Sequence, residues 1–206
     1  STGLISGTIS AAPGNYSVTI TVSSSTGLSA TQSFVWTVTP ATLGTGTLLR
    51  EVWTNIIGFT VAELTGSPAY PDSPDSISEI TNIETPTDFA DAYGQRLRGW
   101  IHAPVTGQYR FWIAGDDESQ LRLSTNDSPA GASLIASVPL GQWAASRDWT
   151  KFPSQTSVLI NLVAGQRYYI EVLHKDAGGP DNLAVGWQIP GSSVTTVVDG
   201  QYLSPW

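Results

Sequence analysis

The alternation of apolar and polar residues with a period of two constrains this chain more than any other feature. It is clear in Tyr16–Val22 and in Gln32–Thr39, each of which predicts a half-buried β-strand. Turn-forming residues lie between them at Ser25–Gly27. Because two or three such strands cannot bury their apolar faces alone, we expect another layer of structure to cover them.

Short strand patterns return after Arg96 and continue almost to the end of the 206-residue chain. Turn residues such as Pro104-Val105-Thr106-Gly107 separate them, and this regular spacing predicts an all-β, antiparallel β-sandwich. The predicted strands cover residues 48–53, 96–103, 108–114, 120–124, 133–138, 157–162, 167–174 and 183–188.

Two segments lack a strong strand pattern. Residues 40–47 are rich in Pro, Thr and Gly and predict a linker. Residues 65–95 contain several prolines and acids but no Lys or Arg, so we expect a long, partly ordered connection there. We place one helical turn near Asp88–Tyr93 and expect no strong amphipathic helix anywhere.

The composition excludes several classes of partner and site. The net charge is −8, and a chain this acidic lacks the basic face that nucleic acid binding requires. The absence of cysteine excludes disulfides and thiolate metal sites, and two histidines are too few for a His-rich zinc site. No apolar run approaches the roughly 20 residues of a membrane helix, so we predict no membrane insertion.

Two acid-bearing loops are the best candidates for a metal site. Asp116 and Asp117 are adjacent, and a divalent cation would remove the repulsion between their carboxylates. The loop from Asp176 to Asn182 carries further oxygen donors, of which Asp181 and Asn182 are the expected side-chain ligands of Ca²⁺. The alternatives are a solvated turn at the first loop and a plain hairpin turn at the second.

Several polar and aromatic residues are candidates for ligand contacts. Trp143 and Trp149 lie in a long loop and either stack on a sugar ring or cover the edge of the sandwich. Asn126 and Asp127 either supply a hydrogen bond at the rim of the site or form a turn. His174 either contacts the ligand or is a structural residue at the edge.

No catalytic set emerges from the sequence. There is no Gly-x-Ser-x-Gly nucleophile elbow, no P-loop and no dinucleotide fingerprint. Asp116 and Asp117 are adjacent in one turn, so they cannot easily flank a scissile glycosidic bond from opposite sides. We therefore predict that the chain is not an enzyme.

Several separate motifs together resemble the PA14 domain, in the form found in bacterial surface proteins and fibrocystin-like proteins. They occur in the family's order, and they are Arg96-Leu97-Arg98-Gly99-Trp100, Gly107-Gln108-Tyr109-Arg110-Phe111, Gly115-Asp116-Asp117, Gly165-Gln166-Arg167-Tyr168-Tyr169 and Gly186-Trp187. Residues 1–39 resemble the second half of an immunoglobulin-like module. The resemblance implies three parts: a partial immunoglobulin-like module at 1–39, a linker at 40–47 and a PA14-like sandwich at 48–206.

The resemblance also implies a function. In PA14 lectins the matching Asp-Asp pair is joined by a cis peptide and binds Ca²⁺, and the resemblance makes the loop from Asp176 to Asn182 the second calcium loop. We therefore predict a calcium-dependent, glycan- or polysaccharide-binding module of an extracellular or cell-surface protein, with this chain a piece of something larger. The alternative is an adhesin or filament subunit that forms a homo-oligomer or exchanges strands through residues 1–40, with calcium only structural.

Overall fold

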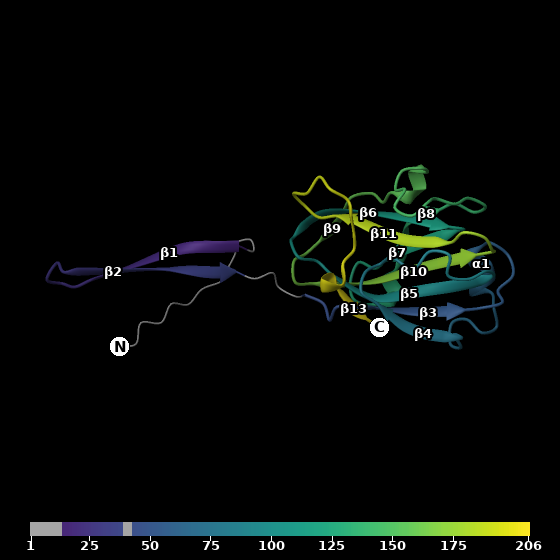
Figure 1. Ribbon diagram of the computed structural model, residues 1–206, viewed down its shortest axis with the longest axis horizontal. Coiled ribbons are helices and arrows are strands. Elements are labelled where there is room, and N and C mark those ends of the chain that lie inside the picture. Colours follow the sequence, from purple (N-terminus) through teal and green to yellow (C-terminus); the bar gives the residue numbers. More distant parts are fainter. Residues whose placement is uncertain (1–13, 39–42) are drawn as a thin grey trace. The chain divides into compact units, whose positions relative to one another are not determined.

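The computed structural model describes residues 14–38 and 43–206 (Figure 1). The chain divides into two compact units, Ser1–Ala41 and Thr42–Trp206. No helix among the described residues is long and apolar enough to cross a membrane. The expectations for residues 1–13 and for residues 40–42 of the linker lie outside the described residues.

The first unit contains an antiparallel hairpin in which β1 (Gly14–Ser23) pairs with β2 (Ser29–Val38). The register places Val18 opposite Phe34 on one face, which is almost wholly apolar. On the other face, Thr19 and Ser33 share a hydrogen bond between their hydroxyls. The two predicted strands therefore form one amphipathic hairpin.

The second unit is a sandwich of two antiparallel sheets, which confirms the predicted fold class. The larger sheet has the order β4-β3-β5-β10-β7-β8, with β13 also pairing with β5, and the smaller has the order β12-β11-β6-β9. The larger sheet contains β3 (Leu48–Trp53), β4 (Ser76–Ile80), β5 (Tyr93–His102), β7 (Ser119–Leu123), β8 (Ser133–Val138), β10 (Arg167–Asp176) and β13 (Leu203–Pro205). The smaller contains β6 (Gly107–Asp116), β9 (Ile160–Leu162), β11 (Asn182–Gln188) and β12 (Thr196–Val197).

The hydrophobic core lies between these two sheets, as the two-residue period requires. Leu97 on β5 and Ile170 on β10 face it from the larger sheet, while Phe111 on β6 and Trp187 on β11 face it from the smaller one. All four side chains are at most 1% exposed. This core holds the strands in register and so fixes where their loops emerge.

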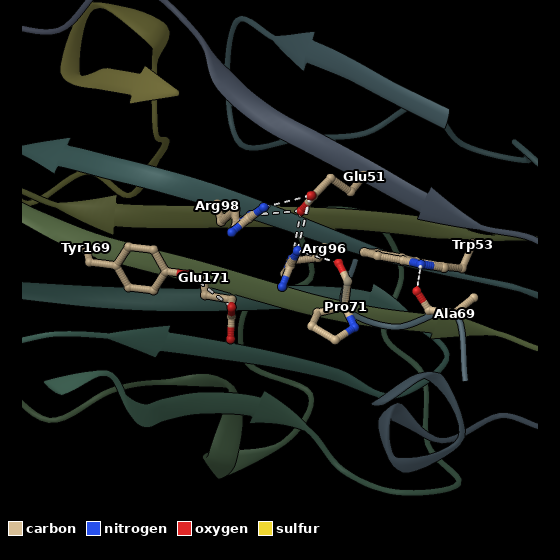
Figure 2. A network of polar contacts seen from close by, with 8 residues as sticks. All are labelled: Glu51, Trp53, Ala69, Pro71, Arg96, Arg98, Tyr169 and Glu171. Carbon is tan, nitrogen blue, oxygen red and sulfur yellow. Dashed lines mark hydrogen bonds and ion pairs between the residues drawn. The ribbon is translucent and has the colours of Figure 1, made fainter. Parts of the chain in front are cut away.

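The outer face of the larger sheet carries a buried charged network (Figure 2). Glu51 on β3 accepts hydrogen bonds from both Arg96 and Arg98 on β5, at 2.7–3.1 Å. Arg96 also donates to the carbonyl oxygen of Pro71, and Tyr169 donates to Glu171 on β10. The network ties the connection after β3 to the middle of the sheet.

The segment between β3 and β5 is more ordered than the sequence indicates. A short helix α1 (Val61–Thr65) begins with a capping box between Thr60 and Glu63, and β4 pairs with β3. The predicted helical turn at residues 88–93 is wrong, because Asp88 and Ala92 have positive φ angles and β5 begins at Tyr93. The short 3₁₀ helices are η1 (Pro129–Gly131), η2 (Pro153–Gln155) and η3 (Gly200–Tyr202).

Candidate functional site

The two acid-bearing loops meet at one end of the sandwich. Strand β6 ends at Asp116, which pairs in register with Asn182 at the start of β11. Asp117 follows, and its N–H donates to the carbonyl oxygen of Lys175 near the end of β10. Its carboxylate accepts a hydrogen bond of 3.0 Å from the N–H of Ala177 in the second loop. The peptide bond between Asp116 and Asp117 is cis, as the family resemblance implies.

Three neighbouring residues have buried side-chain oxygen atoms that accept no hydrogen bond. Asp176 is fully buried, and neither of its carboxylate oxygens has a partner. Asp181 uses Oδ2 to accept from the N–H groups of Phe89 and Ala90, which leaves Oδ1 without a donor. The amide nitrogen of Asn182 donates to the carbonyl of Ala144, so its Oδ1 is also left over. Buried oxygens without donors are costly unless a cation or water satisfies them.

The pKa values of two of these acids reflect the crowding. Burial, together with the charges of Asp181, Asp117 and Asp116, raises the pKa of Asp176 to about 7. Burial and the charges of Asp117 and Asp181 likewise raise the pKa of Asp116 to about 6. Asp116 and Asp176 are therefore harder to ionise, in part because of their acidic neighbours, and a divalent cation would reverse that effect.

This donor set suits Ca²⁺ better than a transition metal. Among residues 14–38 and 43–206, no group of three or more His, Cys, Asp or Glu side chains is arranged so that it could hold a metal ion. Ca²⁺ does not need such a cluster, because it binds six to eight oxygens that include amide and main-chain carbonyl groups. The unpartnered Oδ1 of Asn182 is one such oxygen.

Trp143 lies beside these loops and presents its ring to solvent. Its neighbour Ala144 donates from N–H to the carbonyl of Gly115, directly before Asp116. The indole is 51% exposed, and the ammonium of Lys151 lies 3.3 Å from its ring centroid. The positive charge of Lys151 in turn acts to lower the pKa of Asp116. An exposed aromatic ring and a cation therefore border the acidic cluster.

Trp149, from the same loop, has the covering role that the sequence left open. Its six-membered ring lies over Gly186, where an added Cβ would come within 3.1 Å of Trp149 Cζ2. It packs against a small apolar cluster that contains Ala114 and Ala144. Trp149 therefore covers the outer face of the smaller sheet.

The structure places three of the predicted contact residues where a ligand at this end cannot reach them. His174 is fully buried, and both ring nitrogens bond to protein groups. Asn126 and Asp127 lie beyond Leu123, the end of β7 opposite to the acidic loops. Asn126 closes a turn by accepting from the N–H of Ser128, and Asp127 pairs with Arg167. The structure therefore favours the alternative roles that the sequence left open, a turn for Asn126 and Asp127 and a structural residue for His174.

Asp176 was not predicted as a separate donor, although the sequence contains a signal for it. Residues Ile170 and Val172 face the core, and Asp176 continues their two-residue period. A carboxylate in phase with core positions is expected to be buried. Lys151 was also missed, and no sequence pattern points to it.

A hollow elsewhere in the sandwich shares no residue with the acidic loops. It has a volume of about 600 Å³ and is lined by uncharged side chains from β8, β9 and the segment after β7. Leu134, Val158 and Ile160 are among the lining residues. Because no charged side chain lines it, it offers no ligand set for a cation.

Comparison with known proteins gives two family matches. Residues 62–201 match the PA14 domain family, and residues 1–39 match the He_PIG family of Ig domains. A mouse N-acetyl-beta-glucosaminyl-glycoprotein 4-beta-N-acetylgalactosaminyltransferase 1 is 34% identical over 77% of this chain. Dog fibrocystin is 30% identical over 60% of it. The chain spans only 16% and 3% of these two relatives' lengths.

Solved structures share the fold at low sequence identity. The PA14 sugar-binding domain of an RTX adhesin aligns with a TM-score of 0.60 and 16% identity, over 78% of this chain and 99% of that one. The A domain of epithelial adhesin 9 from Candida glabrata, in complex with Galβ1-4GlcNAc, aligns with a TM-score of 0.55 and 16% identity. That alignment covers 76% of this chain and 88% of the adhesin domain.

Proposed function

Because this chain belongs to the PA14 domain family, we propose that residues 43–206 form a carbohydrate-binding module of an extracellular or cell-surface protein. The module binds a glycan at the end of the sandwich where β6, β10 and β11 bring the acidic loops together. Support for a glycan comes from domains of the same fold, which are described as sugar-binding or carry bound Galβ1-4GlcNAc. Support for an external location comes from their being adhesins.

We further propose that Ca²⁺ joins the glycan to the protein. The observation that carries this is the set of buried, unpartnered oxygens on Asp176, Asp181 and Asn182, next to Asp116 and Asp117. These five residues would hold the ion, and a bound Ca²⁺ would supply a coordination position for vicinal sugar hydroxyls. Trp143 would stack against an apolar face of the sugar, since aromatic rings favour such contacts.

The module binds without catalysis in this proposal. Its acids lie in adjacent loops at one end of the sandwich, where they cannot easily flank a scissile bond from opposite sides. The transferase activity named for the mouse relative does not carry over, because this chain spans only 16% of that protein.

The decisive experiment measures Ca²⁺ and glycan binding separately. Isothermal titration of the wild-type chain with Ca²⁺ should give saturable binding, which Asp116→Ala abolishes. A glycan array should give binding signals in the presence of Ca²⁺, and these signals should disappear in EDTA. Glycan signals that persist in EDTA would remove calcium from the proposal, and an array without any signal would remove the glycan.

A second candidate function is assembly through the hairpin. It is favoured by the apolar face of β1 and β2, where Val22 is 66% exposed and Trp36 is 41% exposed. Apolar sheet faces and free edges recruit partners, here the hairpin of a second copy. Light scattering after size exclusion tests it, because Trp36→Ser should lower the molar mass of any oligomer. A monomer over the whole concentration range would reject it.

A further inference from the structure

A chain of buried hydrogen bonds ends on the main chain of the acidic pair. His174 Nε2 lies 2.7 Å from the carbonyl oxygen of Asp116, and His174 Nδ1 lies 2.8 Å from the side-chain nitrogen of Gln95. The side-chain oxygen of Gln95 accepts a 2.6 Å hydrogen bond from Arg50 Nε. Arg50, Gln95 and His174 are all buried, although none of them is among the residues that would hold the ion.

The chemistry of Arg50 determines which group donates and which accepts in each of these hydrogen bonds. A guanidinium only donates, so Gln95 must turn its carbonyl oxygen toward Arg50 and its NH₂ group toward His174. Nδ1 of His174 then accepts a hydrogen bond, and the ring proton must sit on Nε2. His174 therefore donates to the carbonyl of Asp116. Tyr93 supports the arrangement, because its hydroxyl takes a 3.3 Å contact from Gln95 and its ring packs edge-on against His174.

The peptide group between the two aspartates is thereby held from both sides. His174 donates to its carbonyl oxygen, and its N–H, which belongs to Asp117, donates to the carbonyl oxygen of Lys175. His174 and Lys175 are consecutive residues of β10, a central strand of the larger sheet. The two carboxylates of the pair branch from the ends of this fixed peptide.

Such fixing matters because the local carboxylates repel one another. The charges of Asp117 and Asp181 act on the carboxylates of Asp116 and Asp176, so an unrestrained pair would turn away from the cluster. Holding the pair in place before binding removes the reorganisation cost from the affinity for a cation. The guanidinium of Arg50 also attracts the carboxylate of Asp181, which reduces the repulsion among the carboxylates before an ion binds.

We propose that Arg50, Gln95 and His174 are positioning residues, which orient the Asp116–Asp117 peptide and so raise the affinity of the site for Ca²⁺. The inference rests on the proposed function to the extent that the pair binds Ca²⁺. The direction of hydrogen bonding can be measured without any ion.

The test compares His174→Gln with His174→Met in the full chain. Gln and Met have nearly the same shape, but only Gln keeps an N–H donor close to the position of Nε2. Titration with Ca²⁺ should show a dissociation constant about tenfold higher for the Met variant than for the Gln variant, as for other residues that orient metal ligands. Equal affinities for the two variants would overturn the inference, while leaving Ca²⁺ binding by the wild type intact.

Two further measurements keep the outcomes distinct. Long-range ¹H–¹⁵N spectra of the calcium-free wild type at pH 7 should show the proton of His174 on Nε2, and a proton on Nδ1 would overturn the inference. If His174→Met does not fold, Gln95→Met replaces it, with the same weakening expected and an affinity equal to wild type counting against the inference. A wild-type chain that binds no Ca²⁺ would overturn the proposed function and this inference together.

Discussion

At the scale of single residues, Asp176 is the most informative side chain of the candidate site. It is fully buried, and neither carboxylate oxygen has a hydrogen-bond partner. Natural proteins seldom keep such a group without a role, because its desolvation is costly. A bound cation is the simplest compensation, and it makes Asp176 a direct test of the calcium proposal.

We expect Asp176→Asn to weaken Ca²⁺ binding by at least about tenfold, which corresponds to about 1.4 kcal/mol. The rise in melting temperature on adding Ca²⁺ should shrink accordingly, because that rise depends on ligand concentration relative to the dissociation constant. Differential scanning fluorimetry over a calcium series measures both. Asp127→Asn is the matched control, since Asp127 lies beyond the opposite end of β7 and should leave the response unchanged. A full response in Asp176→Asn would contradict its role as a ligand.

The two loop tryptophans should separate binding from stability. Trp143→Ala is expected to weaken glycan binding about tenfold, or about 1.4 kcal/mol, without changing Ca²⁺ affinity, because its ring is 51% exposed beside the site. Trp149→Ala should instead lower the free energy of unfolding by about 2 kcal/mol, because its ring covers Gly186. Glycan titration and urea denaturation of both variants test the pair. The opposite pattern would mean that the two roles are exchanged.

The sequence locates the site's acids but not which side chains surround them. Asp116, Asp117, Asp181 and Asn182 could be predicted to meet because each borders a strand end. His174 shares the two-residue phase of Ile170 and Val172, so its burial could be predicted, but its hydrogen bonds to Gln95 and Asp116 could not. Asn126 and Asp127 follow the predicted strand 120–124, and that strand alone already separates them from Asp116 and Asp117.

At the scale of elements, one carboxylate links the side chains of the paired strands β3 and β5. Glu51 bonds to Arg96 and Arg98 (Figure 2), and its side chain is only 4% exposed. Burial alone would raise the pKa of Glu51, but hydrogen bonds from Arg96 and Arg98 and their charges hold it below its usual value. The carboxylate is therefore more stable in its charged form in the folded chain than in the unfolded chain.

We expect Glu51→Gln to lower the free energy of unfolding by about 3 kcal/mol near pH 7, because the buried Arg96 and the partly buried Arg98 lose their countercharge. Because the pKa of Glu51 is lowered in the folded state, its charged form stabilises the protein at pH values above the unfolded-state pKa of 4.5. This stabilisation is lost as the pH falls through the folded-state pKa. The difference between variant and wild type should therefore shrink below about pH 4.5. Urea denaturation at several pH values measures it, and a difference independent of pH would contradict the electrostatic account.

The strands of the sandwich were predictable, whereas the segment between β3 and β5 was not. Strands β3 and β8 have the predicted bounds, because alternation and flanking turn residues agree there. Strand β4 has only five residues, four of them exposed, so its pattern carries no apolar face. The turn near Asp88 was misjudged because Asp181 shapes it through hydrogen bonds from residues 89 and 90, a contact far away in the sequence.

At the scale of the whole molecule, the two units differ in what supports them. The hydrophobic core contains buried residues from Leu48 to Leu203, all of them in the second unit. Each acid of the candidate site also belongs to that unit. The sandwich therefore contains its own source of stability, since a domain with its own core folds independently.

We expect a chain that lacks residues 1–41 to keep its fold and its response to Ca²⁺, because the core and the acidic loops remain intact. The melting temperature should change by less than about 4 °C, which corresponds to about 1 kcal/mol for a domain of this size. Calorimetry of the full and shortened chains, each with Ca²⁺ and with EDTA, measures this. Asp176→Asn in the shortened chain is the control for the calcium effect. A shortened chain that melts much earlier, or no longer responds to Ca²⁺, would show that the hairpin contributes to the sandwich, and the two-unit description would have to be abandoned.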